Sequence, residues 1–101
     1  MNSKYNFKKH PNSTAVLNKM LKDKNISFKA KGLLTYLLSC EDSWNFNIKS
    51  IAAMGTDKYE SVRTGLKELE SNGYLKRTVI RKDGKIYDTL YEISDEKIFI
   101  D

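Results

Sequence analysis

The chain has 101 residues, 40% hydrophobic and 31% charged, which is the composition of one folded domain rather than of a disordered segment. Its 18 Lys and Arg residues against 13 acids give a net charge of +5, and no run approaches the ~20 apolar residues of a membrane helix. The single cysteine, Cys40, excludes an intramolecular disulfide and a cysteine-rich zinc site, so we expect a soluble protein of a reducing, cytoplasmic compartment.

The positive charge is concentrated in two segments. Residues 1–31 contain eight lysines and one acid, and residues 76–85 contain five basic residues and one acid. Acids outnumber bases in the rest of the chain. Two interpretations fit this distribution of charge. The lysines are either ordinary solvated residues of a small domain or a basic surface that binds nucleic acid.

The N-terminal residues 1–13 predict a basic arm with a short strand over residues 4–9. The arm carries Lys8 and Lys9, which we regard as weak candidates for contacts with DNA. Arms of this kind are equally often without function.

Two helices are predicted next. Residues 14–24 form a short amphipathic helix, and residues 27–40 form a longer helix that Ser27 caps by accepting a backbone N–H. Gly32 costs the second helix about 1 kcal/mol of propensity relative to Ala. We therefore expect another helix to approach the backbone closely at Gly32.

A helix-turn-helix follows. Residues 47–54 predict a short helix with an Asn cap, and residues 57–72 predict a longer one that begins with a capping box between Asp57 and Glu60. An Asn-Gly pair at 72–73 is a typical helix terminus. The buried face of the helix over residues 57–72 is predicted to consist of Tyr59, Val62, Leu66 and Leu69.

Residues 74–93 predict a β-hairpin, followed by a tail over residues 94–101. Asp83-Gly84 is a strong signal for a two-residue turn, because both central positions need positive φ. The residues predicted to share one face are Tyr74, Ile80, Tyr87, Tyr91 and Ile93. The whole chain, 1–101, is thus predicted to be one α+β domain: a winged helix-turn-helix with a three-helix core, a C-terminal β-hairpin wing and an extra N-terminal strand and short helix.

Three stretches carry a resemblance to a known family. Ile26–Ser39 (ISFKAKGLLTYLLS), Trp44–Asn47 (WNFN) and Leu66–Leu75 (LKELESNGYL) resemble the winged-helix N-terminal domains of replication initiators and replisome organisers from phages and mobile elements of Gram-positive bacteria. The similarity spans about residues 5–93. It implies double-stranded DNA binding in replication initiation or transcriptional regulation. Since those proteins usually continue into a second domain, a smaller regulator or accessory protein is also compatible with the resemblance.

The candidate contacts with DNA follow from the predicted fold. The second helix of a helix-turn-helix enters the major groove, and the wing lies beside the phosphate backbone. The helix candidates are Lys58, Glu60, Ser61, Arg63, Thr64 and Lys67. The wing candidates are Arg77, Arg81, Lys82 and Lys85. The acids on this helix would face a polyanion, so an ordinary solvated face is the alternative.

No enzymatic constellation is found in the sequence. His10 is the only histidine and lies in the predicted arm, no Walker-type phosphate loop occurs, and no residues have metal-ligand spacing. We therefore expect a non-enzyme without cofactor or metal. The alternative function is a protein-binding winged helix that docks on a host or phage protein, and the apolar tail Ile98-Phe99-Ile100 could also pair two subunits into a homodimer.

Overall fold

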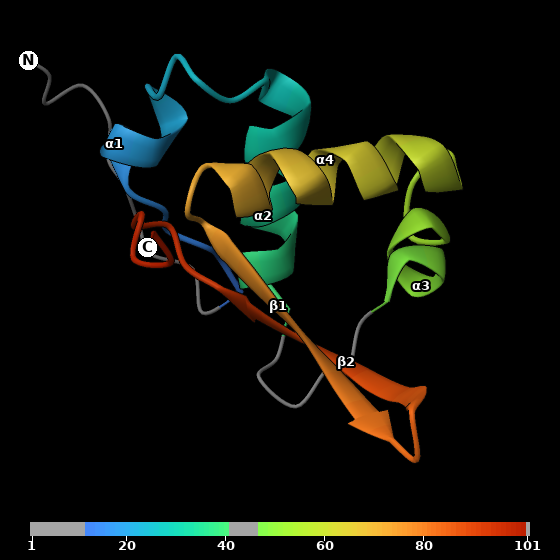
Figure 1. Cartoon of the computed structure of the whole chain (residues 1–101). Coiled ribbons are helices and arrows are strands. Elements are labelled where there is room, and N and C mark those ends of the chain that lie inside the picture. Colours follow the sequence, from blue (N-terminus) through green and yellow to red (C-terminus); the bar gives the residue numbers. More distant parts are fainter. Residues whose placement is uncertain (1–11, 41–46, 101) are drawn as a thin grey trace, which may run out of the picture.

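The computed structural model describes residues 12–40 and 47–100, and these residues form an α+β fold (Figure 1). The predicted strand over residues 4–9, with Lys8 and Lys9, lies outside the described residues, and so does Asp101 at the end of the predicted tail. The elements, in chain order, are α1 (Asn18–Leu21), α2 (Phe28–Leu38), α3 (Ile48–Ala52), α4 (Tyr59–Ser71), β1 (Leu75–Lys82) and β2 (Lys85–Ile93).

The starts of α2 and α3 are set by their caps, as predicted. The Ser27 hydroxyl accepts a hydrogen bond from the Ala30 N–H at 3.1 Å, which satisfies a free donor of the first turn of α2. At α3, Asn47 accepts from the Ser50 N–H at 2.8 Å, and the Ser50 hydroxyl accepts from the Asn47 N–H at 3.0 Å. This reciprocal capping box adds a partner that the sequence interpretation missed. Helix α1 is only four residues long, much shorter than the predicted 14–24.

The predicted capping box of α4 is wrong. The helix begins at Tyr59, its N-cap is Lys58, and no side chain caps it. Glu60 binds the guanidinium of Arg63 instead, because a charged donor one turn away competes well against a backbone N–H. The other end of α4 is as predicted, since Gly73 follows the helix with a φ of +84°.

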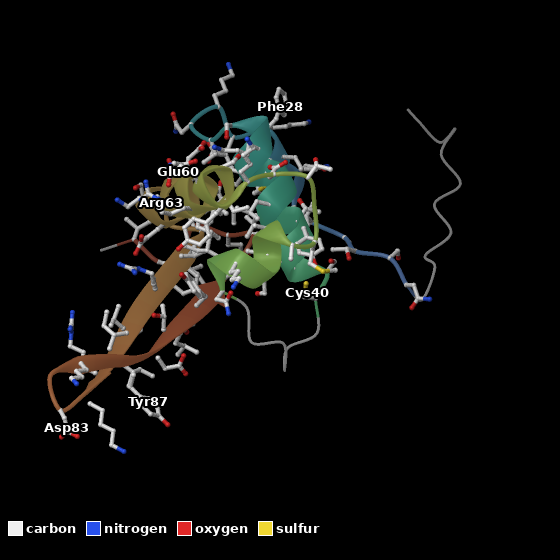
Figure 2. All side chains as sticks on the ribbon, turned by 90° about the vertical axis from the view of Figure 1, so that its right-hand side faces the viewer. Phe28, Cys40, Glu60, Arg63, Asp83 and Tyr87 are labelled. Carbon is white, nitrogen blue, oxygen red and sulfur yellow. The ribbon has the colours of Figure 1, made fainter. Side chains whose placement is uncertain are left out.

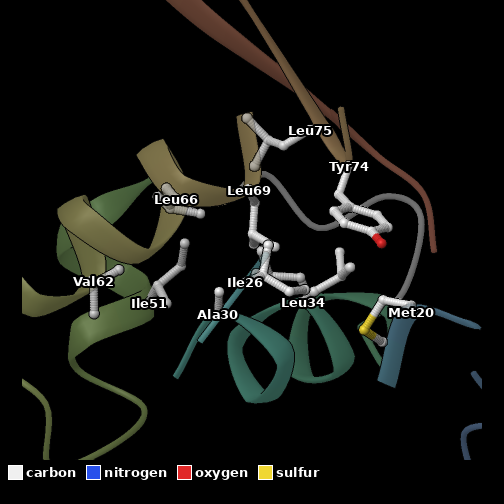
Figure 3. Packing of buried hydrophobic residues seen from close by; sticks show 11 residues of the cluster. Met20, Ile26, Ala30, Leu34, Ile51, Val62, Leu66, Leu69, Tyr74 and Leu75 are labelled. Atoms are coloured by element: carbon white, nitrogen blue, oxygen red, sulfur yellow. The ribbon is translucent and has the colours of Figure 1, made fainter. Parts of the chain in front are cut away.

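One apolar core joins the helices to the base of the hairpin (Figure 3). Helices α2 and α4 cross over it, α3 closes it at one side, and Met20 of α1 closes it at the other (Figures 1 and 3). Tyr59 was predicted to be buried but is exposed, because it lies on the flank of α4 that faces the hairpin. The fully buried large side chains are Met20, Leu34, Leu37, Leu69 and Leu75.

The close approach between helices occurs at Gly65 and not at Gly32. A Cβ atom on Gly65 would lie 2.9 Å from Cδ2 of Leu33, so this glycine lets α4 cross tightly over α2. A Cβ atom on Gly32 would meet nothing within 4 Å. The prediction for Gly32 is therefore wrong, because the residue faces away from the crossing, over a groove between α2 and α3.

The hairpin has the predicted turn but a different inner face. Asp83 and Gly84 have φ values of +54° and +78°, as a tight turn with both central residues left-handed requires. A bulge between Ile80 and Arg81 shifts the register, and Ile80 lies opposite Asp88 and is exposed. The predicted face was wrong in this respect. Tyr87 was also predicted to lie on this face but is exposed, whereas Tyr91 and Ile93 lie on it as predicted. The face consists of Leu75, which is buried, and of Val79, Thr89, Tyr91 and Ile93, which are half-buried.

A polar cluster joins the loop after α1 to the base of the hairpin and to the C-terminal tail. The carboxylate of Asp23, only 8% exposed, accepts from the Tyr74 hydroxyl at 2.6 Å and pairs with the Lys97 ammonium at 3.0 Å. These partners, with the Asn25 N–H, lower the pKa of Asp23 to about 2, the Tyr74 hydroxyl contributing most. Burial, followed by the hydrogen bond to Asp23, raises the pKa of Tyr74.

Candidate nucleic-acid interface

The outer face of α4 is the side turned away from Val62, Leu66 and Leu69. Helical spacing places Glu60, Thr64, Lys67 and Ser71 along this face, and all four are exposed. Ser61 and Arg63 lie on its two flanks and are half-buried. Lys58 is exposed just before the helix. The predicted helix residues therefore all reach the surface on or beside one face.

Glu60 and Arg63 form the ion pair of this helix. Nε of Arg63 donates to both carboxylate oxygens of Glu60, at 3.1 and 3.0 Å, and Nη2 donates to Oε2. The hydrogen bond from Arg63 lowers the pKa of Glu60, and the same bond raises the pKa of Arg63. The Glu60 charge that argued against a polyanionic partner is thus offset by a neighbouring cation.

Helix α2 adds a cation that the sequence interpretation missed. Nζ of Lys29 donates to the Thr64 hydroxyl at 2.8 Å, so this lysine lies against the outer face of α4. The tight crossing at Gly65 places it there, because the Lys29 stem lies 3.7 Å from where a Gly65 Cβ would be. The two residues are 35 positions apart, and no local spacing signals such a contact.

Glu68 lies on the same flank of α4 as Lys29, and it is also engaged. Its carboxylate accepts from the Ser27 hydroxyl at 2.8 Å and from the Ser27 N–H. A second acid of α4 is thus hydrogen-bonded to the start of α2. The free N–H groups of that helix end stabilise a negative charge.

The other flank of α4 faces a groove against the hairpin. Arg63 and Lys67 of α4 and Arg77 of β1 line this groove, which has a volume of about 320 Å³. Tyr59 and Tyr91 form part of its wall, and Glu70 is the acid within it. The groove therefore brings together three of the predicted contacts, two from α4 and one from β1.

The hairpin carries exposed cations at its far end. Arg81, Lys82 and Lys85 are exposed, and none of them forms an ion pair within the described residues. Lys82 lies over the ring of Tyr87, with 5.6 Å between the ammonium and the ring centre. Figure 2 shows Arg63 and the hairpin tip at Asp83 projecting toward the same side of the molecule.

The described residues include no group of three or more His, Cys, Asp or Glu side chains placed to hold a metal ion. Within 12–40 and 47–100, no helix is long and apolar enough to cross a membrane. Comparisons of the chain with protein-family models, with curated proteins and with solved structures found no match.

Proposed function

We propose that the protein binds double-stranded DNA as a winged helix, with α4 in the major groove and the β1–β2 wing along the phosphate backbone. The observation that carries the proposal is the placement of cations on both sides of α4. Lys29 of α2 lies on one flank. Lys67 and Arg77 line the groove on the other, beside Arg63. A phosphate backbone passes on each side of a helix inserted in the major groove, so cations on both flanks suit this partner.

The charge of the wing supports the same assignment. Arg81, Lys82 and Lys85 stand at an exposed tip without an ion-pair partner in the described part of the chain. Cations in this position neutralise phosphate beside the helix or in the minor groove. The biological role that fits is replication initiation or transcriptional control by a phage or mobile-element protein, as the sequence resemblance implies.

Salt dependence of binding tests the proposal. Fluorescence anisotropy with a labelled random-sequence duplex gives the affinity over a range of NaCl concentrations. Each neutralised phosphate contributes about −0.9 to the slope of log K against log salt, so replacing Arg81, Lys82 and Lys85 together with Ala should make the slope shallower by about 2 to 3.

The control replaces Lys19, Lys22 and Lys24 with Ala. These lysines are also exposed, belong to α1 and the loop after it, and removing them changes the net charge equally. We expect this variant to keep the wild-type slope within about one unit. An affinity that is independent of salt, or an equal loss of slope in both triple variants, would contradict the proposed interface.

A second candidate function is docking on another protein. A groove of about 350 Å³ runs between α2 and α3, and two large apolar side chains at it are strongly exposed, Phe28 by 86% and Met54 by 65%. Exposed apolar residues around a groove are typical of partner sites. Capture of a host protein that persists after nuclease treatment, and that is lost in Phe28→Ser, would favour this function over DNA binding.

A further inference from the structure

The contact between Glu60 and Arg63 leaves one end of the guanidinium free. An arginine has five N–H donors in a planar fork, and Glu60 occupies the edge formed by Nε and Nη2. The remaining donors are both hydrogens of Nη1 and the second hydrogen of Nη2. One hydrogen on each of these nitrogens points off the end of the group, parallel to the other.

Two parallel donors at this spacing match guanine. In the major groove guanine presents two adjacent acceptors, N7 and O6, and bidentate binding by arginine is the commonest specific contact with DNA. Adenine presents a donor beside its N7, so it cannot accept both bonds. Arg63 lies in the first half of α4, where a recognition helix reaches base edges.

We infer that Arg63 reads a guanine in the major groove and that Glu60 is the positioning residue that fixes the plane of its guanidinium. This inference rests on the proposed function and adds its base specificity. A free arginine side chain has many rotamers, and holding it in one orientation reduces the entropy lost on binding a base. Glu60 therefore contributes to specificity although its own charge is unfavourable near phosphate.

The inference assigns Glu60 a different role from that of a direct contact. A glutamate on a recognition helix can also accept from the N4 amino group of cytosine. In this structure both oxygens of the Glu60 carboxylate already accept from Arg63. Arg63 is thus the partner of both oxygens, and the negative charge of Glu60 is paired with this arginine.

The test is selection of bound duplexes from a randomised pool, followed by sequencing, for the wild type and three variants. Arg63→Lys keeps the charge but removes the fork. Glu60→Gln removes the charge and one of the two strong acceptors. Glu92→Gln is the matched control, because the Glu92 side chain is exposed on β2 and makes no hydrogen bond or ion pair within the described chain. Thermal unfolding of each variant confirms that the fold is retained.

We expect the wild type to select guanine at one position by about tenfold over the other bases. Arg63→Lys should weaken that preference, because an ammonium can still donate to guanine but lacks the planar fork, and it should keep nonspecific affinity within about threefold. Glu60→Gln should weaken the preference at the same position. Replacing the selected guanine with 7-deazaguanine, which lacks N7, should weaken the wild type severalfold and weaken Arg63→Lys less.

Four outcomes would overturn the inference. Arg63→Lys could keep the wild-type preference at every position, Glu60→Gln could change the preference at a different position from Arg63→Lys, or Glu92→Gln could reproduce the effect of Glu60→Gln. Binding of duplexes without any base preference would also overturn it while leaving the proposed function intact. A wild type that binds no duplex at low salt would instead refute the proposed function itself.

Discussion

Asp23→Asn removes the negative charge that binds the Tyr74 hydroxyl, the Asn25 N–H and the Lys97 ammonium. The resulting loss in the free energy of unfolding can be worked out from the pKa of the carboxyl. This pKa falls from an ordinary 3.8 to about 2 in the folded protein. One pKa unit corresponds to about 1.4 kcal/mol, so the ionised carboxylate stabilises the fold by about 2 kcal/mol.

The direction of the pH dependence follows from the lowered pKa. Because the unfolded chain binds the proton more tightly than the native state, the stabilisation is fully present above about pH 4 and is lost as the pH falls toward 2. We therefore expect Asp23→Asn to lower the free energy of unfolding by about 2 kcal/mol at pH 7, and by much less near pH 2. For a domain of this size, the loss corresponds to a Tm about 10 °C lower at pH 7.

Urea denaturation followed by circular dichroism at pH 7 and pH 2.5 measures the effect, and NMR titration of the Asp23 carboxyl measures its pKa directly. The matched control is Asp57→Asn, since Asp57 is exposed and makes no hydrogen bond within the described residues. An Asp23→Asn protein as stable as the wild type at pH 7, or an Asp23 carboxyl that titrates near 3.8, would refute the reasoning.

Three further substitutions test the packing by the same urea denaturation. Gly32→Ala should raise the free energy of unfolding by about 0.5 to 1 kcal/mol, because the new Cβ atom meets nothing and alanine is the better helix former. A lower free energy of unfolding would mean that the space beside Gly32 is occupied. Gly73→Ala should lower it by at least about 1 kcal/mol, since φ is +84° and the new Cβ would meet Ile100, and an unchanged midpoint would contradict this strain. Leu69→Ala should cost about 2 to 5 kcal/mol, and a cost below 1 kcal/mol would mean that the core collapses around the cavity.

The features that the sequence predicted correctly depend on a few adjacent residues. Ser27 caps α2, the glycine after Asn72 adopts positive φ, and Asp83-Gly84 makes the tight turn. In each case a side-chain oxygen next to a free N–H, or a residue that tolerates left-handed backbone, decides the conformation locally. The α+β class then follows from the order of the elements.

The features that could not be predicted from the sequence depend on contacts between distant residues. The spacing of Glu60 suits both a capping box and an ion pair with Arg63, and only the three-dimensional arrangement distinguishes the two. The contact of Lys29 with Thr64 requires the helix crossing at Gly65, which no pattern within α2 indicates. A bulge next to Ile80 shifts the register of β1 against β2 by one residue, so Val79 is half-buried and Ile80 is exposed, because strand side chains alternate with a period of two.

The tail beyond the hairpin has a consequence for the order of folding. It returns to the first part of the described chain: Asp95 accepts from the Leu17 N–H across a separation of 78 residues, and Lys97 reaches Asp23. During synthesis, α2, α3 and α4 can pack before these tail residues exist. The Asp23 cluster then lacks its cation until residue 97 has been added, and closing so long a loop is slow relative to forming a helix. We therefore expect the nascent chain to hold a helical core with an incompletely secured α1, and to reach full stability only when the tail docks.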